Sequence, residues 1–190
     1  MKRFFDIVIS LFALVILSPL LALIALAVLI DDGSPVVFRQ KRVGKDEKLF
    51  DIFKFRTMKR NTRTSSTKEL EESGDCITRV GRILRVTSLD ELLQLVNVLG
   101  GSMSLVGPRP LIPEEEDIAE LRREYGVYSV RPGITGWAQV NGRDDISAEK
   151  KALLDKEYVE KQSVLFDIKI LFRTVKVVIT GENISEGGES

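Results

Sequence analysis

The chain has 190 residues, which suits one domain, and its acidic and basic residues balance at 28 each. It contains no histidine and a single cysteine, Cys76. This excludes Ser-His-Asp and Cys-His catalysis, an intramolecular disulfide and a multi-cysteine zinc site, so any chemistry must rest mainly on carboxylates and cations.

The first predicted element is an apolar run without charge, residues 7–30. As a helix it would be roughly 36 Å long, enough for a hydrocarbon core of about 30 Å. Ser18-Pro19 near its middle predicts a kink or break, because proline removes an N–H and clashes with the carbonyl of Val15. Basic residues flank both ends. A re-entrant helix keeps both flanks in the cytoplasm, whereas an ordinary kinked transmembrane helix does not, and the residues alone leave both topologies open.

A basic segment with a hairpin pattern follows. Between Arg39 and Arg63 ten Lys and Arg residues face three acidic ones, which indicates a surface for phosphate, nucleotide or an anionic membrane, or else a solvated charged face. Residues 36–40 and 50–55 read as strands with Gly44 between them, which predicts a β-hairpin. Residues 61–74, rich in Ser, Thr and charge, predict a mobile loop.

The next predicted element is a helix at 77–86, with Arg79, Arg82 and Arg85 on one face. A second helix is expected at 89–99, where Leu and Val recur at helical spacing and Ser88 and Glu91 match the capping-box pattern. Further helices are predicted at 113–125, at 147–162 with Ser147 as the cap, and at 165–179, whose cationic amphipathic pattern suits a membrane interface.

These elements predict a helix-rich α+β fold. We expect a membrane helix at 1–35, a compact membrane-associated domain at 36–180 with a small β-hairpin and interfacial amphipathic helices, and a flexible acidic tail at 181–190.

Two adjacent carboxylates, Asp90 and Glu91, lie at the predicted start of the second helix. The simplest interpretation is structural: Glu91 caps the helix and Asp90 complements its dipole. The dipole should also lower the pKa of Asp90 and keep it ionised. Arginines stand nearby in the sequence, and arginine binds phosphate bidentately, so an anion-binding site is the alternative. The arginines in question are Arg85, Arg109 in the rigid turn 107–110, and Arg131 before the turn 132–136.

Over nearly its whole length the chain resembles the monotopic phosphoglycosyl transferases of bacteria, also called bacterial sugar transferases, and among them the small bacillosamine-type members. The order and spacing of several motifs carry the resemblance: Ser18-Pro19, Phe38-Arg39-Gln40-x-Arg42-x-Gly44, Lys54-Phe55-Arg56-Thr57-Met58, Ser88-Leu89-Asp90-Glu91-Leu92, Asn97-Val98-Leu99, the run from Met103 to Pro110 and the run from Arg131 to Arg143. Leu93 departs from the proline that many relatives carry there.

The resemblance implies a reaction. A phospho-sugar, with an N-acetylated sugar as the best expectation, would pass from a UDP-sugar to polyprenol (undecaprenyl) phosphate with release of UMP. Asp90 would be the nucleophile that carries the phosphosugar, and Glu91 with Asp90 would bind Mg²⁺. Ser18-Pro19 would break a re-entrant helix, and the protein would lie on the cytoplasmic face of the bacterial inner membrane. It would act in glycoconjugate assembly, and no nucleic-acid partner is expected. Downstream glycosyltransferases are possible partners.

The remaining candidate residues are cations and polar groups. Lys54, Arg85, Arg109, Arg131 and Arg143 are expected to contact phosphate or nucleotide, with surface charge as the alternative. Polar residues add three candidates: Gln139 and Asn141 would bind sugar or base or else stabilise turns, and Asp155 matches an acidic position associated with the family's active site or is a helix-surface carboxylate. Trp137 would stack on a base, or else lie at the membrane interface or in the core.

Two other functions are compatible with parts of the pattern. A non-catalytic membrane anchor would use the basic surface to bind anionic lipid or a partner protein. A CDP-alcohol phosphotransferase would need several aspartates on spanning helices, and the sequence does not carry them.

Overall fold

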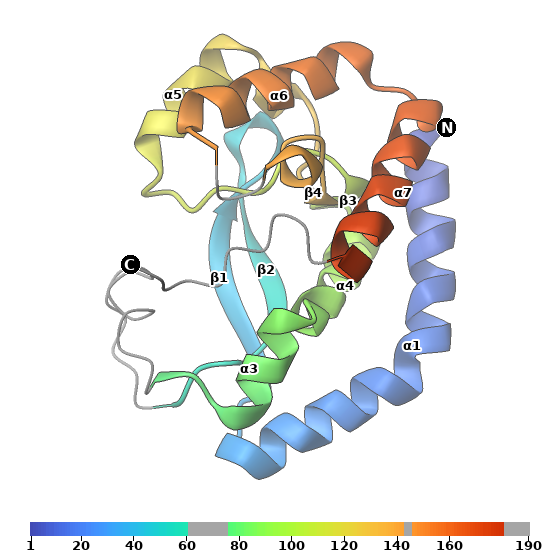
Figure 1. Ribbon diagram of the computed structural model, residues 1–190, viewed down its shortest axis with the longest axis vertical. Coiled ribbons are helices and arrows are strands. Elements are labelled where there is room, and N and C mark those ends of the chain that lie inside the picture. Colours follow the sequence, from blue (N-terminus) through green and yellow to red (C-terminus); the bar gives the residue numbers. More distant parts are fainter. Residues whose placement is uncertain (61–75, 143–145, 181–190) are drawn as a thin grey trace.

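The structure is a computed structural model that describes residues 1–60, 76–142 and 146–180. The predicted loop at 61–74, the candidate Arg143 and the predicted tail at 181–190 lie outside the described residues. The fold is α+β and helix-rich, as predicted, and a long hairpin runs through its middle (Figure 1). The elements are α1 Lys2–Asp32, β1 Val37–Val43, η1 Lys45–Glu47, β2 Leu49–Phe55, α3 Arg79–Val86, η3 Leu89–Leu93, α4 Gln94–Gly100, β3 Ser104–Val106, α5 Glu116–Glu124, η4 Val127–Ser129, β4 Gly133–Thr135, η5 Gln139–Asn141, α6 Ala148–Lys161 and α7 Val164–Thr180, where η denotes a 3₁₀ helix.

The central hairpin confirms the strand prediction. β1 and β2 pair antiparallel from Val37 opposite Phe55 to Val43 opposite Leu49. Gly44 begins the connection, and a Cβ there would lie 3.0 Å from both the Lys48 carbonyl and the Phe50 ring, so a side chain would crowd the turn. In Figure 1 the open end of the hairpin meets α3 and α1, and its turn reaches the layer of α5 and α6.

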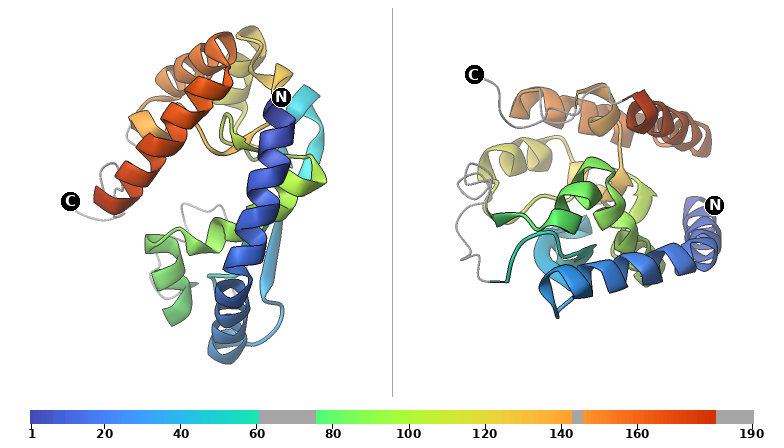
Figure 2. Two further views of the ribbon diagram at one scale, coloured as in Figure 1. Left: turned by 90° about the vertical axis from the view of Figure 1, so that its right-hand side faces the viewer. Right: turned by 60° about the horizontal axis from the view of Figure 1, so that its bottom comes forward.

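Helix α1 bends in its middle, as the Ser18-Pro19 pair predicts. Pro19 lies inside the helix, and the Ser18 hydroxyl donates to the carbonyl oxygen of Val15 at 2.8 Å. The serine thus bonds the carbonyl that would otherwise pair with an N–H at position 19, which proline lacks. Figures 1 and 2 show two limbs, one along the side of the molecule and one beneath it. Among the described residues α1 is the one helix long and apolar enough to cross a membrane.

Polar side chains hold the amino-terminal end of α1 on the domain. The Lys2 ammonium lies 2.6 Å from the Asp167 carboxylate on α7. Arg3 donates to the carbonyl oxygens of Val98 and Leu99, at 2.6 and 3.1 Å, where α4 ends. Basic side chains suit a helix carboxyl end because unpaired carbonyls gather there.

Asp6 reaches the same part of the domain. Its buried carboxylate accepts from the Ser104 hydroxyl at 2.9 Å and from the Leu105 N–H at 3.2 Å, both in β3. The first two turns of α1 therefore do not stand free.

The carboxyl end of α1 is held by the same domain. Asp31 accepts from the N–H of Val80 at 2.9 Å, and Arg56 donates to the carbonyl oxygens of Asp32 and Gly33 at 2.9 and 2.7 Å. Both ends of α1 thus bind the rest of the described chain. The boundaries predicted at 35 and 180 stay predictions.

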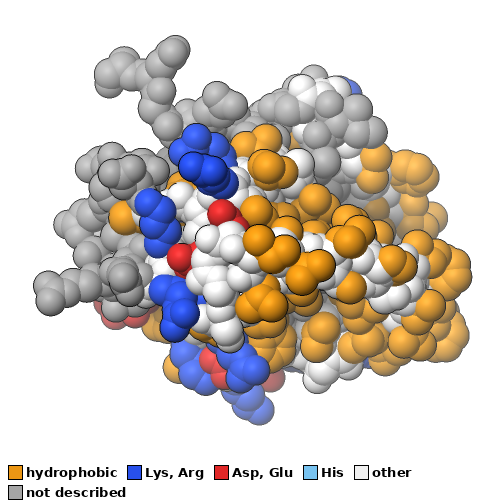
Figure 3. Space-filling view, turned by 90° about the horizontal axis from the view of Figure 1, so that it is seen from below, with side chains coloured by type: hydrophobic (Ala, Val, Ile, Leu, Met, Phe, Trp, Pro, Cys, Tyr) orange, Lys and Arg blue, Asp and Glu red, His pale blue; other side chains and the backbone are white. Residues whose placement is uncertain are grey.

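The outer side of α1 is apolar. Hydrophobic side chains cover one part of the surface seen from below, and Lys and Arg gather beside them (Figure 3). Along α1, from its third turn onward, the large apolar side chains that are more than half exposed are Leu11, Phe12, Val15, Ile16, Leu23, Leu26 and Ile30. Burying so many large side chains in lipid instead of water is favourable.

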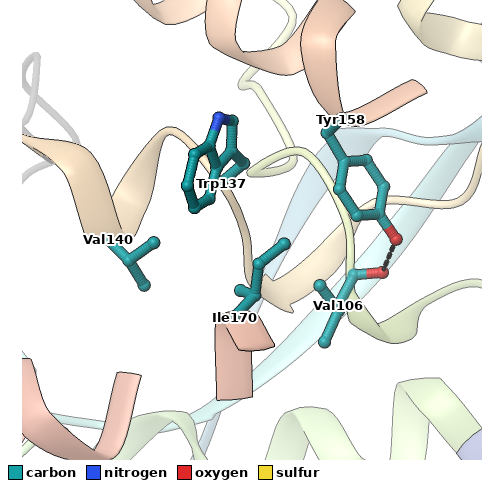
Figure 4. Close-up of a cluster of buried hydrophobic side chains, with 5 residues drawn as sticks. All are labelled: Val106, Trp137, Val140, Tyr158 and Ile170. Atoms are coloured by element: carbon teal, nitrogen blue, oxygen red, sulfur yellow. Dashed lines mark hydrogen bonds between the residues drawn. The ribbon is translucent and has the colours of Figure 1, made fainter. Parts of the chain in front are cut away.

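Four apolar clusters hold the described elements together, and two of them position the hairpin and the carboxyl-terminal helices. One joins β3, η5, α6 and α7, and Figure 4 shows its five buried side chains. In it the Tyr158 hydroxyl donates to the carbonyl of Val106 at 2.9 Å. The second joins α1 to the hairpin and α3 through Ile24, Val28, Phe55 and Leu84.

The prediction for residues 89–99 is partly wrong. The segment begins as the 3₁₀ helix η3 and becomes α-helical only in α4. Ser88 has a φ of 55°, and its side chain makes no cap hydrogen bond, so the predicted capping box does not form. The Glu91 side chain bonds a lysine instead. At α6, by contrast, the predicted cap is confirmed, since Ser147 accepts from the N–H of Lys150.

Candidate active site

A small polar pocket lies where one face of the hairpin meets η3, α4, β4, η5 and the turn that carries Arg109. Its volume is about 10 Å³, the room of about one water molecule. The predicted residues Lys54, Glu91, Arg109 and Gln139 all line it. The other lining residues are Arg42, Ile52, Gln94, Pro110, Gly133 and Ile134.

An ion pair forms one wall of the pocket. The Lys54 ammonium lies 2.7 Å from Glu91 Oε1, and both side chains are more than four-fifths buried. Lys54 comes from β2 and Glu91 from η3, so the pair also connects the hairpin to the segment that carries both carboxylates. In this pair the positive charge of Lys54 balances the negative charge of Glu91.

Asp90 is buried beside this pair, with 9% of its surface exposed, and does not itself line the pocket. Burial raises the pKa of its carboxyl to about 6, Glu91 adds to the rise, and Lys54 and Arg85 oppose it. The predicted lowering by a helix start is wrong, because η3 is a short 3₁₀ helix and desolvation of the carboxylate outweighs its dipole. A group with this pKa is still mostly ionised at pH 7.

The turn that presents Arg109 is held through its backbone. Four successive carbonyl oxygens, of residues 108–111, each accept a hydrogen bond from another part of the chain. The bonds are Gly133 N–H to Pro108 at 2.9 Å, Arg122 Nη1 to Arg109 at 2.8 Å, Arg42 Nη1 to Pro110 at 3.1 Å and Val43 N–H to Leu111 at 2.9 Å. Such a turn holds the Arg109 side chain at the pocket without needing a ligand.

Two glycines let the neighbouring turns approach. A Cβ on Gly136 would lie 2.1 Å from the carbonyl oxygen of Gly107, and one on Gly133 would lie 2.1 Å from the Gly107 nitrogen. These distances exclude any side chain, so the glycines allow β4 to pack against the turn that carries Arg109.

Arg42 lines the pocket, although it is not among the site residues predicted from the sequence. It is partly buried on β1, its Nη2 donates to Gln40 at 2.8 Å, and burial with the charge of Arg109 nearby lowers its pKa. Its buried Nε has no hydrogen-bond partner among the described residues, and neither has the buried Oε1 of Gln139. The register pairs Arg42 with Phe50, and alternation along β2 puts Phe50 on the same face as Lys54. This shared face with a predicted residue is the signal that could have found Arg42.

Asp155 does not line the pocket. It is 1% exposed, and its carboxylate accepts from Arg122 Nε at 2.9 Å. Arg122 in turn donates to the Arg109 carbonyl, so Asp155 lies behind the turn as a support. It is a buried ion-pair partner and not a helix-surface carboxylate.

Two predicted arginines lie outside the pocket. Arg85 Nε donates to the Thr57 hydroxyl at 3.0 Å, and its charge acts on Asp90. Arg131 is exposed and donates to the Gly101 carbonyl at 2.8 Å. Arg85 is thus near the carboxylates, whereas Arg131 supports a neighbouring turn.

Asn141 stabilises a turn and Trp137 lies in the core, so both have the structural role that was the alternative to substrate binding. The Asn141 amide donates to the Trp137 carbonyl at 2.7 Å and accepts from Arg173 at 2.9 Å. Trp137 is 9% exposed, in the cluster of Figure 4, and its Nε1 donates to Glu157 at 2.8 Å. The structure places neither at the pocket.

The carboxylates fit a magnesium site that a substrate completes. Among the described residues no three or more Cys, Asp or Glu side chains gather around one point. Mg²⁺ commonly takes one or two carboxylates, water and substrate phosphates, so Asp90 and Glu91 beside a cationic pocket are a suitable donor set.

The fold and the pocket together define a class of protein: an apolar, proline-bent helix docked on a domain whose polar pocket combines two arginines, a lysine and a glutamate beside a buried aspartate. The chain belongs to the bacterial sugar transferase family, whose model matches residues 1–181.

Curated relatives match along most of this chain. It is 44% identical over 182 residues to a UDP-glucose:undecaprenyl-phosphate glucose-1-phosphate transferase of Escherichia coli K12, covering 92% of this chain and 39% of the relative. It is 41% identical over 194 residues to an undecaprenyl-phosphate galactose phosphotransferase of Salmonella typhimurium, covering 94% and 40%. A Bacillus subtilis relative, uncharacterized sugar transferase EpsL, is 41% identical over 192 residues, covering 98% and 91%. The chain therefore spans about two fifths of the first two relatives and nearly all of the third.

Proposed function

We propose that the protein transfers a sugar-1-phosphate from a UDP-sugar to undecaprenyl phosphate and releases UMP. The observation that carries the proposal is the pocket, where Lys54, Glu91, Arg42 and Arg109 converge beside Asp90 in a member of this family. Relatives named as glucose and galactose phosphotransferases support the substrate classes.

In the first step Asp90 acts as the nucleophile. A carboxylate oxygen attacks the phosphorus that bears the sugar, a P–O bond to Asp90 forms, and the bond to the bridging oxygen breaks as UMP leaves. Like charges repel in this attack, so cations must neutralise the diphosphate. Arg42 and Arg109 are the groups we assign to it, and the buried Nε of Arg42 would find a phosphate oxygen as its partner.

In the second step an oxygen of the lipid phosphate attacks the same phosphorus. The bond to Asp90 breaks, the carboxylate is regenerated, and the product is the polyprenyl diphosphate sugar. Two substrates thus use one site in turn, which gives ping-pong kinetics. Mg²⁺ held by Asp90 and Glu91 would supply further charge neutralisation of the diphosphate. Lys54 orients Glu91 through the 2.7 Å ion pair.

The topology we propose is re-entrant, at the cytoplasmic face of the bacterial inner membrane. Both ends of α1 bind the same domain, through Lys2, Arg3 and Asp6 at one end and Asp31 and Asp32 at the other. A straight span would separate these ends by a hydrocarbon core of about 30 Å. The bend at Pro19 supports a helix that enters and leaves on one side.

The identity of the sugar is a further part of the proposal. The N-acetylated donor and the bacillosamine-type subgroup rest on the resemblance in sequence alone, whereas the two relatives above carry glucose and galactose in their names. A panel of UDP-glucose, UDP-galactose and their N-acetylated counterparts separates these donors by the rate of UMP release.

The decisive test is a burst assay. Purified protein with Mg²⁺ and a UDP-sugar, but no acceptor, should release about one UMP per active site, because the phosphosugar stays on Asp90. Asp90→Asn should abolish both the burst and turnover with undecaprenyl phosphate. Full activity in that variant would sink the nucleophile assignment. The alternative, an anchor without catalytic function, predicts that the unaltered protein releases no UMP and that Asp90→Asn binds membranes as well as the unaltered protein does.

A further inference from the structure

A second and larger depression lies at the open end of the hairpin. Residues 34–39 and Arg56 form this groove, whose volume is about 690 Å³. Its lining is mainly apolar, and Val37 and Phe38 remain 37% and 43% exposed. A half-exposed phenylalanine beside valine and proline is a surface suited to hydrocarbon.

The strand register brings this groove to the catalytic pocket. Phe38 is directly opposite Lys54 in the antiparallel pair of β1 and β2. Directly opposite residues project from the same face of a sheet, with Cβ atoms about 5 Å apart. Lys54 lines the catalytic pocket and binds Glu91, so Phe38 begins the apolar surface next to the pocket wall.

The other end of the groove lies next to the last turns of α1. Val36, which lines the groove, packs on the buried cluster that joins α1 to the hairpin. In the same turns of α1, Leu26, Leu29 and Ile30 are 52%, 46% and 77% exposed. The groove therefore lies between the helix that we place in lipid and the cation at the catalytic pocket.

Two arginines line the groove, but they do not supply its free charge. Arg56 is 7% exposed and pairs with Asp32 at 3.1 Å. Arg39 lies over the Phe53 ring at 5.3 Å, on the face of the hairpin opposite to Phe38. The cation on the Phe38 face is Lys54. An apolar wall that begins beside an ammonium group favours a ligand that combines a hydrocarbon chain with a phosphate.

We propose that this groove holds the first part of the acceptor's hydrocarbon chain and guides the lipid phosphate to the Lys54 side of the pocket. The inference rests on the proposed function and deepens it, since it assigns the acceptor a site of its own. The donor diphosphate would lie at Arg42 and Arg109, further along the same hairpin face. Phe38 is then a specificity-determining residue for a long-chain phosphate.

The test compares Phe38→Ser with Leu49→Ser, a matched control at the other end of the hairpin, where Leu49 is 57% exposed. We measure the UMP burst with UDP-sugar alone and the KM for undecaprenyl phosphate. Phe38→Ser should leave the burst unchanged and raise the acceptor KM about tenfold, as expected when an apolar contact of this size is lost. Phe38→Leu should restore most of the affinity, and Leu49→Ser should match the unaltered protein.

Two results would overturn the inference. One is an unchanged acceptor KM in Phe38→Ser; if sedimentation of this variant with phosphatidylglycerol vesicles is weakened at the same time, the groove binds membrane phospholipid instead. The other is an equal rise of the acceptor KM in Leu49→Ser, which would mean a general effect of surface polarity. Absence of a burst in the unaltered protein would instead refute the proposed function, so the two failures are distinguishable.

Discussion

At the scale of single residues, the environment of Asp90 combines a need for charge with a cost of burial. The nucleophile must be ionised to attack, yet desolvation favours its neutral form and raises its pKa to about 6. Lys54 and Arg85 limit that rise. The residue therefore stays reactive at neutral pH while remaining less solvated than a surface carboxylate.

This pKa predicts a pH profile. The ionised form of Asp90 is the reactive one, so kcat/KM for the donor should fall by half near pH 6 and by about tenfold for each further pH unit. The measurement is the initial rate of UMP release between pH 5 and 8. A rate that is flat down to pH 4.5 would contradict a buried Asp90 as the nucleophile.

The same group predicts a gain of stability on its removal. The folded chain holds the Asp90 proton more tightly than the unfolded chain, so folding is favoured at low pH and loses this contribution as the pH rises from about 4 to about 6. Asp90→Asn should therefore be more stable at pH 8, by up to about 3 kcal/mol, and similar at pH 4. Thermal unfolding in detergent at both pH values measures the difference.

At the scale of elements, the turn that carries Arg109 depends on two helices. Arg122 of α5 and Asp155 of α6 form a buried pair, and Arg122 also donates to the Arg109 carbonyl. The sequence singled out Asp155 but not its role, because the partner lies 33 positions away and no local pattern connects them.

This pair predicts separate effects on stability and on donor binding. Asp155→Ala should cost about 3–5 kcal/mol, because it leaves a buried guanidinium unpaired. The double variant Asp155→Leu, Arg122→Met should recover most of that stability, because it leaves no unpaired buried charge. Its KM for the UDP-sugar should nevertheless be raised, because Arg122→Met removes the donor to the Arg109 carbonyl. Thermal unfolding and donor KM separate the two. A double variant with normal KM would refute the positioning role.

Elements with a strong local signal were predictable. The hairpin follows from alternation and Gly44, the bend of α1 from Ser18-Pro19, and the start of α6 from Ser147. The capping box at Ser88 and Glu91 was wrong, because Lys54 from β2 binds the glutamate and the serine adopts a left-handed conformation. A tertiary contact thus outweighed a local pattern.

At the scale of the whole molecule, α1 and the domain form one unit. Its first turns contact β3 and α4, and its last turns contact the hairpin and α3. The views of Figure 2 show the helix wrapping one side and the underside of the domain. Any movement of the membrane helix must therefore break polar contacts at one of its ends.

The re-entrant topology predicts equal accessibility of both helix ends. In a Cys76→Ser background, Phe4→Cys and Ser34→Cys should both react with a membrane-impermeant maleimide in inside-out vesicles and neither in intact cells. Leu20→Cys, near the bend, is the control that lipid should cover, and it should react in neither. Labelling of Phe4→Cys in intact cells would support a spanning helix.

The sequence by itself determined the apolar helix with its bend, the hairpin, most helices and the adjacent carboxylates, because each depends on residues close together in the chain. Only the tertiary structure decided which cations reach the pocket. It brought Arg42 in, kept Arg131 and Asn141 out, and put Asp155 behind the turn. It also reversed the expected pKa shift of Asp90, since desolvation depends on every element packed around a group and a local sequence pattern does not contain that information.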